Sequence, residues 1–286
     1  MDADVDTWHS TAAVARLFSS FFRTKSKANV DETMSYFSRA KLTYIDATLG
    51  LAKYDGQSLH DQFVEFMLHW PAGSASYPSR IMGDASSAVV FFTTAGPFGP
   101  SEIRAVGVVN FEAGKVVRWV DYWDGRHFGL ANLNALKVPN SQFPTNFEED
   151  TVREANSEIL EKVAHGLAGA LHEQDYAKAV SYFAPDAVLT DHPSHLAVTG
   201  TKSIGSFLSQ AGGLLPFVGP GTAVRHVVGS SAGGAFEWTA EGVVPRGVST
   251  IELDAWGNIN RLDTMWDGAL ADNDTLLGLA SSAIEH

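Results

Sequence analysis

The sequence contains one structural unit twice, and this internal repeat constrains the fold more than any other feature. The triplet Trp123-Asp124-Gly125 recurs as Trp266-Asp267-Gly268, and the pair Tyr36-Phe37 recurs as Tyr182-Phe183. The copies are 146 residues apart at the tyrosine pair and 143 residues apart at the triplet, so their alignment hardly drifts. Because self-similarity of this kind marks duplicated structure, and 286 residues suffice for two ordinary domains, we expect two tandem domains of one fold.

The expected domain limits follow from a break in the pattern. The segment 138–150 is rich in Pro, Asn and acidic residues, which are typical of a connection rather than of a buried element. We therefore predict a first domain over residues 1–137, a linker over residues 138–150 and a second domain over residues 151–286.

Each copy is predicted to begin with helices and to end with a sheet. Apolar side chains at helical spacing predict a helix around residues 14–22 and its counterpart around residues 159–171. The later part of each copy is rich in Val, Phe and Trp, with hairpin turns predicted at 112–115 and 255–257. Helices followed by antiparallel strands are typical of the α+β class rather than of a parallel α/β fold.

Composition excludes several classes of function. The net charge of −13 argues against a nucleic-acid partner, and we interpret the densest basic run, 23–27, as a helix end where cations suit the dipole. The chain has no cysteine, which excludes thiolate nucleophiles and sulfur-ligated metals, and the scattered histidines predict no metal site. The first residues lack the pattern of a secretory signal, and no apolar run is long enough to cross a bilayer. We therefore expect a cytoplasmic protein with no membrane partner and no cofactor.

Three helices and a sheet whose last strand ends in Trp-Asp, present twice, resemble the SnoaL-like superfamily, also called nuclear-transport-factor-2-like (NTF2-like). Its members include polyketide cyclases, ketosteroid isomerase, scytalone dehydratase and limonene epoxide hydrolase, together with proteins that only bind or dimerise. The tandem layout is similar to that of the epoxide-opening cyclases of polyether biosynthesis. The resemblance implies two cone-shaped domains, each with three helices packed on a curved antiparallel sheet that encloses an apolar pocket. It also implies that the copies pair as an intramolecular pseudo-dimer, so that the protein is a monomer or a weak homodimer.

The reactive groups left to such a pocket are carboxylates and imidazoles, which transfer protons when burial shifts their pKa. A short strand is predicted early in each copy, over residues 42–45 and 188–191, and we call it the early strand. One carboxylate stands at its end: Asp46 in the first copy, and Asp191, followed by His192, in the second. In ketosteroid isomerase and the polyether cyclases an Asp at this place is the base or the acid, so the resemblance implies a catalytic role for Asp46 and Asp191. The alternative is an ordinary turn, for which the sequence Asp-His-Pro-Ser is typical.

A third carboxylate is singled out by strand alternation in the last strand of the first copy. Asp121 shares a strand face with Trp119 and Trp123, where the second copy has Thr264 at the matching position. Because one copy lacks this acid, the fold does not require it, and we interpret Asp121 as a catalytic candidate.

Symmetry leads to the opposite interpretation for Asp124 and Asp267, which occur in both copies and are therefore predicted to be structural. Glu241 is the last acidic candidate. If its face of the strand lines the pocket, Glu241 joins Asp191 and His192 in a second site; if that face is the outer one, Glu241 is a solvated charge.

The predicted pocket wall consists mainly of aromatic side chains, with a histidine at the mouth. Its predicted members are Tyr44, His69, Phe91, Trp119, Trp123, Trp238 and Trp266. The sequence thus predicts a cofactor-independent cyclase or isomerase, with epoxide opening as a further option, acting on a hydrophobic polyketide- or terpenoid-like small molecule. The alternative is a non-catalytic module of the same fold that binds a small molecule or serves in assembly.

Overall fold

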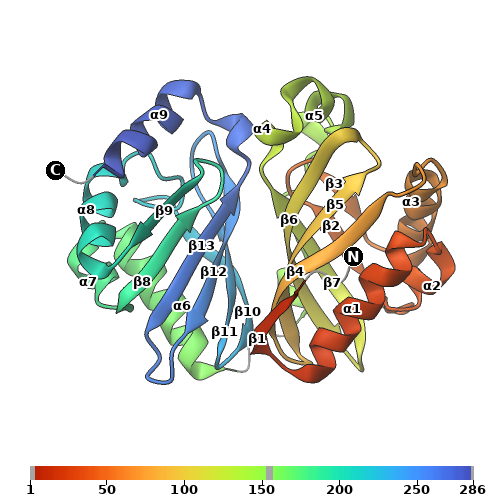
Figure 1. Ribbon diagram of the computed structural model, residues 1–286, viewed down its shortest axis with the longest axis horizontal. Helices are drawn as coiled ribbons and strands as arrows, with labels where there is room; N and C mark the ends of the chain where they lie inside the picture. The colour runs from red at the N-terminus through yellow and green to blue at the C-terminus, as the bar shows by residue number, and fades with distance from the viewer. Residues whose placement is uncertain (1–3, 153–156, 285–286) are drawn as a thin grey trace. The chain divides into compact units, whose positions relative to one another are not determined.

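The computed structural model describes residues 4–152 and 157–284, and the chain divides into two compact units, Met1–Glu154 and Ala155–His286 (Figure 1). The outermost residues of the predicted domains, Met1 and His286, lie outside the described residues. Each unit combines a curved sheet with helices packed against it. The predicted α+β class and the tandem arrangement are therefore confirmed.

Within residues 4–152, the first unit has a seven-stranded sheet in the order β1-β4-β5-β6-β7-β2-β3. Strand β1 is parallel to β4 and β2 is parallel to β7, while the other neighbours are antiparallel. The elements in chain order are β1 (Asp6–Ser10), α1 (Ala12–Ser26), α2 (Val30–Met34), β2 (Thr43–Asp46), β3 (Leu51–Lys53), α3 (Gly56–Leu68), β4 (Ala75–Gly83), β5 (Ser87–Gly96), β6 (Gly99–Glu112), β7 (Lys115–Trp123), α4 (Gly125–Phe128) and α5 (Leu130–Leu136).

The described part of the second unit has a six-stranded sheet in the order β10-β11-β12-β13-β8-β9, which repeats the first sheet without a counterpart of β1. Strand β13 is parallel to β8, as β7 is to β2. The elements are α6 (Glu158–His172), α7 (Tyr176–Val180), β8 (Phe183–Asp191), β9 (Leu196–Thr199), α8 (Thr201–Ala211), β10 (Ala223–Ser230), β11 (Gly233–Thr239), β12 (Arg246–Leu253), β13 (Ile259–Trp266), the 3-10 turn η3 (Gly268–Leu270) and α9 (Asn273–Ser282).

The long first helices of the two units have the same design. Thr11 caps α1 by accepting a hydrogen bond from the amide of Val14, and Ser157 caps α6 in the same way through the amide of Leu160. Both helices span 15 residues, so their positions correspond one to one at an offset of 146 residues. In this alignment, Lys25 of α1 corresponds to Leu171 of α6.

Some elements were not predicted from the sequence. Strand β4 contains Pro78, and its register with β5 shifts between Pro78 and Arg80. Proline inside a strand argues against strand assignment unless a bulge or edge accommodates it, which is why the pattern of β4 is hard to recognise. The helices that follow each Trp-Asp-Gly triplet are short, and only one or two turns of each carry an apolar side chain into the core.

The segment 138–150, predicted to be a linker, belongs to the first unit. It forms two 3-10 turns, η1 (Asn140–Gln142) and η2 (Glu149–Thr151), and its Phe147 is fully buried. The backbone carbonyl of Phe147 accepts a hydrogen bond from Nε of Arg118 at 2.8 Å. One buried aromatic side chain and one buried guanidinium contact thus hold a segment whose overall composition is that of a loop.

The tryptophan of each triplet ties the last strand to the aspartate that ends the early strand. The indole Nε1–H of Trp123 donates to both carboxylate oxygens of Asp46, at 3.1 and 3.0 Å. The indole of Trp266 donates to Oδ1 of Asp191 at 2.7 Å. An indole N–H can only donate, so a buried tryptophan at this place needs an acceptor, and the aspartate supplies it in both units.

The aspartate of each triplet caps the turn that follows. Oδ1 of Asp124 accepts from the amide of Arg126 at 2.9 Å, and Oδ1 of Asp267 accepts from the amide of Ala269 at 3.1 Å. These bonds satisfy amide groups that a helical turn leaves without an intrahelical partner. The repeated triplet thus has a structural role at the end of the last strand of each unit.

Replacing Trp266 by Phe is expected to lower the free energy of unfolding by about 1–3 kcal/mol, because the fully buried Asp191 carboxylate then loses one of its donors. Urea unfolding followed by circular dichroism measures the change. The matched control is Trp256→Phe, since Trp256 is 84% exposed in the turn between β12 and β13 and should have no measurable effect. Equal losses in the two variants would contradict the anchoring role of the indole–carboxylate bond.

Candidate active site

A cavity of about 390 Å³ lies inside the first unit, between the sheet and the helices. Five ionisable side chains line it from four different elements: Lys25 in the last turn of α1, Tyr44 and Asp46 in β2, Asp121 in β7, and the exposed Glu65 in α3. The rest of the wall is largely apolar and aromatic, including Phe63, Phe66, Phe92, Phe98, Trp123 and Leu136. The volume is in the lower part of the range found for small-ligand pockets, which are typically apolar with a few placed polar groups.

The parallel pairing of β2 with β7 brings the two carboxyl groups to one place. Asp46 pairs with Asp121 in register, and side chains in register point to the same face of a sheet. Gly107 of β6 is the next partner of Asp121. A Cβ atom at Gly107 would lie 3.0 Å from Nε1 of Trp119 and 3.2 Å from Oδ1 of Asp121, so the missing side chain leaves room for these two groups to meet.

Asp46 lines the cavity with one carboxylate oxygen well anchored and the other less so. Its Oδ1 accepts from the amides of Thr48 and Leu49, at 3.0 and 2.7 Å, and from the indole of Trp123, whereas its Oδ2 accepts from Trp123 alone. Burial raises the pKa of Asp46 to about 7; the amide of Leu49 opposes the rise and the charge of Asp121 adds to it. Asp46 therefore exchanges its proton near neutral pH.

Asp121 is the more deeply placed of the two acids, with 5% of its surface exposed. Its Oδ1 accepts from the indole of Trp119 at 2.5 Å, and its Oδ2 accepts from the hydroxyl of Tyr44 at 2.7 Å. Burial raises the pKa of Asp121 to about 6, while Lys25, Trp119 and Tyr44 favour the ionised form and limit the rise. Burial together with the two carboxylates raises the pKa of Tyr44 well above its usual value, so Tyr44 stays a hydrogen-bond donor.

Lys25 brings an amine into the same cavity. The residue is 7% exposed, and its Nζ lies 5.2 Å from the ring centre of Phe92 and 5.8 Å from that of Phe22. Within residues 4–152 and 157–284, no hydrogen bond holds this amine and no carboxylate oxygen lies within 4.0 Å of it. Burial lowers the pKa of Lys25 to about 8, and the charge of Asp121 works against that decrease.

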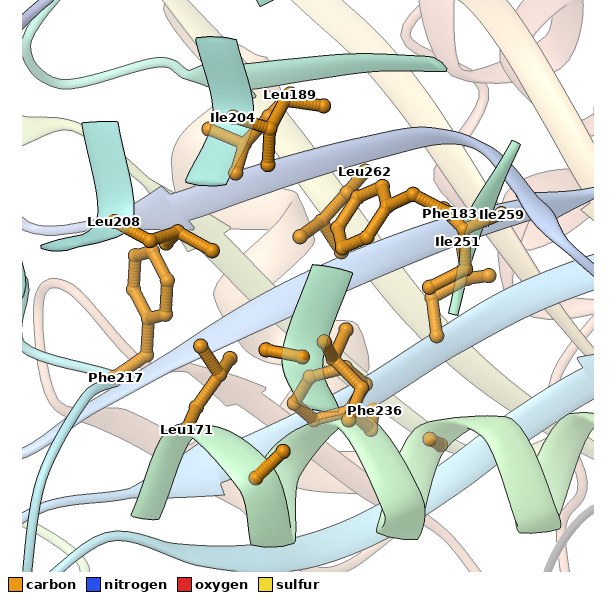
Figure 2. Close-up of a cluster of buried hydrophobic side chains, with 14 of the residues drawn as sticks. Leu171, Phe183, Leu189, Ile204, Leu208, Phe217, Phe236, Ile251, Ile259 and Leu262 are labelled. Atoms are coloured by element: carbon orange, nitrogen blue, oxygen red, sulfur yellow. The ribbon is translucent and has the colours of Figure 1, made fainter. Parts of the chain in front are cut away.

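The second unit has apolar or neutral residues in place of three of these ionisable groups. The strand registers and the helix alignment match Tyr44 with Leu189, Asp121 with Thr264, and Lys25 with Leu171. Leu171 and Leu189 are buried members of the apolar core of the unit (Figure 2). The second unit therefore has a packed core at the place where the first has its charged cavity.

Asp191 corresponds to Asp46 but has a different environment. It is fully buried, and its Oδ1 accepts from Trp266 and from the hydroxyl of Thr264, at 2.7 and 2.8 Å. Its Oδ2 accepts from the amide of Ser194 at 3.1 Å and also from the hydroxyl of that residue. With four donors on two oxygens, the carboxylate is engaged in the turn that follows β8, and it does not line a cavity with His192 and Glu241.

The other two polar candidates of the second unit lie apart from Asp191. His192 is about one-third exposed and has its Nε2 3.8 Å from Oδ1 of Asp263. Glu241 is exposed and lines a separate surface cavity of about 370 Å³ together with Val243. The structure thus brings together Asp46 and Asp121, but not Asp191, His192 and Glu241.

The predicted wall residues fall into several places. Trp123 lines the cavity, as does Tyr44, while Trp119 packs beneath it against a group of phenylalanine rings. His69 is exposed at the end of α3 and does not line the cavity. Phe91 lies on the opposite face of β5, where the guanidinium of Arg80 stands 3.9 Å over its ring.

In the second unit, Trp238 and Trp266 are both part of the apolar core. Trp238 also lines a cavity of about 250 Å³ near α6 and β10, together with His165 and His172. This cavity does not include Asp191.

Several residues of the site were not predicted, and two of them, Phe92 and Lys25, show why. Phe92 rather than Phe91 lines the cavity, because Phe92 pairs with Ala105 and Ala105 pairs with Trp123, which fixes the inward face of β5. Lys25 was interpreted as part of a basic helix end and not as a site residue. The sequence nevertheless contains a signal for the burial of Lys25. Phe18, Phe21 and Lys25 recur at helical spacing and therefore share the buried face of α1.

Comparison with known proteins gives similar folds at low sequence identity. No protein-family model matches this sequence, and no curated protein matches it. Solved structures that are similar include a steroid delta-isomerase from Pseudomonas aeruginosa (16% identity, 45% of this chain and 92% of that chain, TM-score 0.35). They also include a candidate SnoaL-like polyketide cyclase from Shewanella putrefaciens CN-32 (14%, 44% and 88%, TM-score 0.37). A third is an NTF2-like protein of unknown function from Burkholderia xenovorans LB400 (15%, 39% and 82%, TM-score 0.34). Each of the three alignments covers less than half of this chain.

Two further observations concern the described residues as a whole. None of their helices is both long enough and apolar enough to span a bilayer. Nor do residues 4–152 and 157–284 contain a group of three or more His, Asp or Glu side chains placed to hold a metal ion.

The variant Asp46→Asn is expected to be more stable than the wild type above pH 7. Asp46 has a pKa of about 7 when folded and about 3.8 when unfolded, so between these values the folded state binds more protons. The free energy of unfolding of the wild type therefore falls as pH rises through this window, whereas Asn carries no charge and keeps Oδ1 as acceptor. Thermal unfolding at pH 5 and pH 8 tests this: the gain should be small at pH 5 and correspond to at least about 2–4 °C at pH 8.

Asp55→Asn is the control for this experiment. Asp55 is an exposed cap of α3 whose pKa is lowered by hydrogen bonds from Ser58, and Asn caps a helix about as well as Asp. This control should show no stabilisation at pH 8. If Asp46→Asn also failed to stabilise at pH 8, the raised pKa of Asp46 would be refuted.

Proposed function

We propose that the cavity of the first unit is the active site of a cofactor-independent acid–base enzyme, an isomerase or cyclase that moves protons on an apolar small molecule. The observation that carries this proposal is the presence of two carboxyl groups, Asp46 and Asp121, in one apolar cavity with pKa values raised to about 7 and about 6. Carboxyl groups tuned to the operating pH transfer protons most effectively. Pairs of acids whose environments separate their pKa values are typical of acid–base sites.

The difference between the two acids supports a division of roles. Lys25, Trp119 and Tyr44 favour the ionised form of Asp121, whereas the charge of Asp121 disfavours ionisation of Asp46, so Asp121 loses its proton before Asp46 as the pH rises. Asp121 then acts as the base that takes a proton from a carbon next to an activating group of the substrate. Asp46 acts as the acid that delivers a proton elsewhere on the same molecule, and Tyr44 holds Asp121 in place through its hydroxyl.

The same pair would serve cyclisation and epoxide opening. In that case Asp121 takes the proton of an attacking hydroxyl, while Asp46 protonates the oxygen that leaves the epoxide carbon. We propose a polyketide- or terpenoid-like substrate, because the wall of the cavity is formed mainly by aromatic and aliphatic side chains. The proposal includes a cytoplasmic location, a monomer or weak homodimer, and no cofactor, as the sequence predicts.

The second unit is proposed to support the first rather than to catalyse. Buried leucines take the positions of Lys25 and Tyr44, and its Asp191 is held by four donors. Activity should accordingly depend on the carboxylates of one unit and not on the matching carboxylate of the other.

Asp46→Asn and Asp121→Asn are each expected to slow proton abstraction by about 10²–10⁴-fold. The measurement is deuterium incorporation from heavy water into a β,γ-unsaturated cyclic ketone at the carbon next to the carbonyl, followed by NMR. The probe tests proton transfer without knowledge of the natural substrate. Glu112→Gln, which removes an exposed carboxylate of the same unit, is the control and should exchange at the wild-type rate. If both aspartate variants kept that rate, or if the wild type gave no rate above buffer, the binding-module alternative would be favoured instead.

The pH dependence of exchange should be bell-shaped. The base Asp121 must be ionised, so the rate rises with pH through about 6; the acid Asp46 must be protonated, so the rate falls through about 7. Because the two groups interact, the two limbs report the pair rather than either residue alone. In the variant Asp46→Asn the falling limb should disappear while the rising limb remains. A profile that is flat from pH 5 to pH 8 would contradict the assignment.

A further inference from the structure

We propose that Lys25 is a catalytic nucleophile that binds a ketone or aldehyde substrate covalently as an iminium ion inside the cavity of the first unit. This inference names the substrate class of the proposed active site and rests on that function. It starts from the amine itself: Lys25 is 93% buried, lines the cavity with Asp46 and Asp121, and has no hydrogen-bond or ion-pair partner among the described residues.

An amine in this situation requires an explanation, because a buried polar group without a partner is costly. Structural lysines place the ammonium in water or against a carboxylate, whereas the amine of Lys25 faces the rings of Phe22 and Phe92. The second unit has Leu171 at the matching position and packs it in its core, so the fold does not need a lysine here. The amine is therefore available to react with a molecule in the cavity.

The surroundings increase the fraction of the amine that is in its reactive, neutral form. Desolvation by an apolar pocket is one of the known ways to activate a lysine for attack on carbonyl groups. With the pKa of Lys25 lowered to about 8, roughly one-tenth of the amine is neutral at pH 7, whereas an ordinary lysine with a pKa of about 10.4 has less than one-thousandth in that form.

The two carboxyl groups supply the proton transfers that iminium formation needs. The lone pair of Nζ forms a bond to the carbonyl carbon as the π electrons move to oxygen. Asp46 gives its proton to that oxygen, and Asp121 takes a proton from nitrogen, which leaves a neutral carbinolamine. Asp121 then returns its proton to the hydroxyl group, the C–O bond breaks, and water departs as the nitrogen lone pair forms the C=N⁺ bond.

The balance of this sequence is complete without an oxidant or an added cofactor. The reactants are one amine, one carbonyl compound and the proton of Asp46; the products are one iminium ion, one water and the Asp46 carboxylate. Asp121 ends ionised, and it is then placed to remove a proton from the carbon next to the iminium. That step gives an enamine, the intermediate through which isomerisation or ring closure proceeds.

Trapping with a reductant tests the proposal directly and needs no turnover. The protein is incubated at pH 7 with 3-phenylpropanal and sodium cyanoborohydride for a short time, and alkylated lysines are located by peptide mass spectrometry. Lys27 is the internal reference, since it lies two residues away on the exposed cap of α1. We expect Lys25 to be labelled at least tenfold faster than Lys27, labelling at position 25 to be lost in Lys25→Arg, and no change at Lys25 in Lys27→Arg. Equal or faster labelling at Lys27 would overturn the proposal.

The exchange assay with the β,γ-unsaturated ketone separates this inference from the proposed function. Lys25→Arg keeps a positive charge near Asp121 but cannot form an iminium ion, so a loss of exchange by at least about tenfold is expected. If Lys25→Arg exchanged at the wild-type rate while Asp46→Asn and Asp121→Asn did not, the acid–base function would stand and the covalent role of Lys25 would be refuted. Circular dichroism and the melting temperature of Lys25→Arg, and of a second variant, Lys25→Met, confirm that a loss reflects the missing amine rather than a failure to fold.

Discussion

The bond from a tryptophan indole to an aspartate carboxylate organises each unit of this protein. It joins the end of the last strand to the end of the early strand, β7 to β2 in the first unit and β13 to β8 in the second. A buried indole needs an acceptor and a buried carboxylate needs donors, so neither partner is stable without the other. The pairing therefore fixes the ends of these two adjacent strands relative to each other. It also holds in place an aspartate that points into the interior.

The same constraint has different consequences in the two units. In the second unit Thr264 and Ser194 complete the donors around Asp191, and the core includes Leu171 and Leu189 at the positions of Lys25 and Tyr44. In the first unit the position of Thr264 is taken by Asp121, which adds a second negative group instead of a donor. Two acids cannot share a dry interior as a pair of full charges, so the first unit keeps a proton on one of them near neutral pH and faces them with Lys25.

This arrangement of ionisable groups also accounts for the cavity of the first unit. The matching residues of the second unit, Leu171 and Leu189, are both buried members of its apolar core (Figure 2). Polar and charged groups disfavour such packing, because their polar ends need space and hydrogen-bond partners. The first unit consequently lacks apolar packing at this place and has a cavity with ionisable walls instead. It also lacks the stability that a packed core would provide there.

The sequence was sufficient for the fold and for part of the site. The repeat, the helical stripe of α1 and the alternation in β7 predicted two α+β units, the inward face of Trp119, Asp121 and Trp123, and the loss of that acid in the second copy. The face of β5 could not be read in this way, since Phe91 and Phe92 are both apolar and only the ladder through Ala105 distinguishes them. Asp191 shows a second limit: its position matches that of Asp46, but only the structure shows that its oxygens are already occupied.

Lys25 shows most clearly how a local rule and a global one can conflict. A lysine in the last turn of a helix suits the helix dipole, and that local rule explained Lys25 without assigning it to the site. The apolar stripe through Phe18 and Phe21 makes the opposite prediction, and the structure follows the stripe. Burial alone would make the ammonium too unfavourable, and the nearby charge of Asp121 offsets part of that penalty. Lys25 and Asp121 thus depend on each other: the amine lowers the pKa of the acid, the acid raises the pKa of the amine, and a substrate that neutralised either one would change the proton affinity of the other.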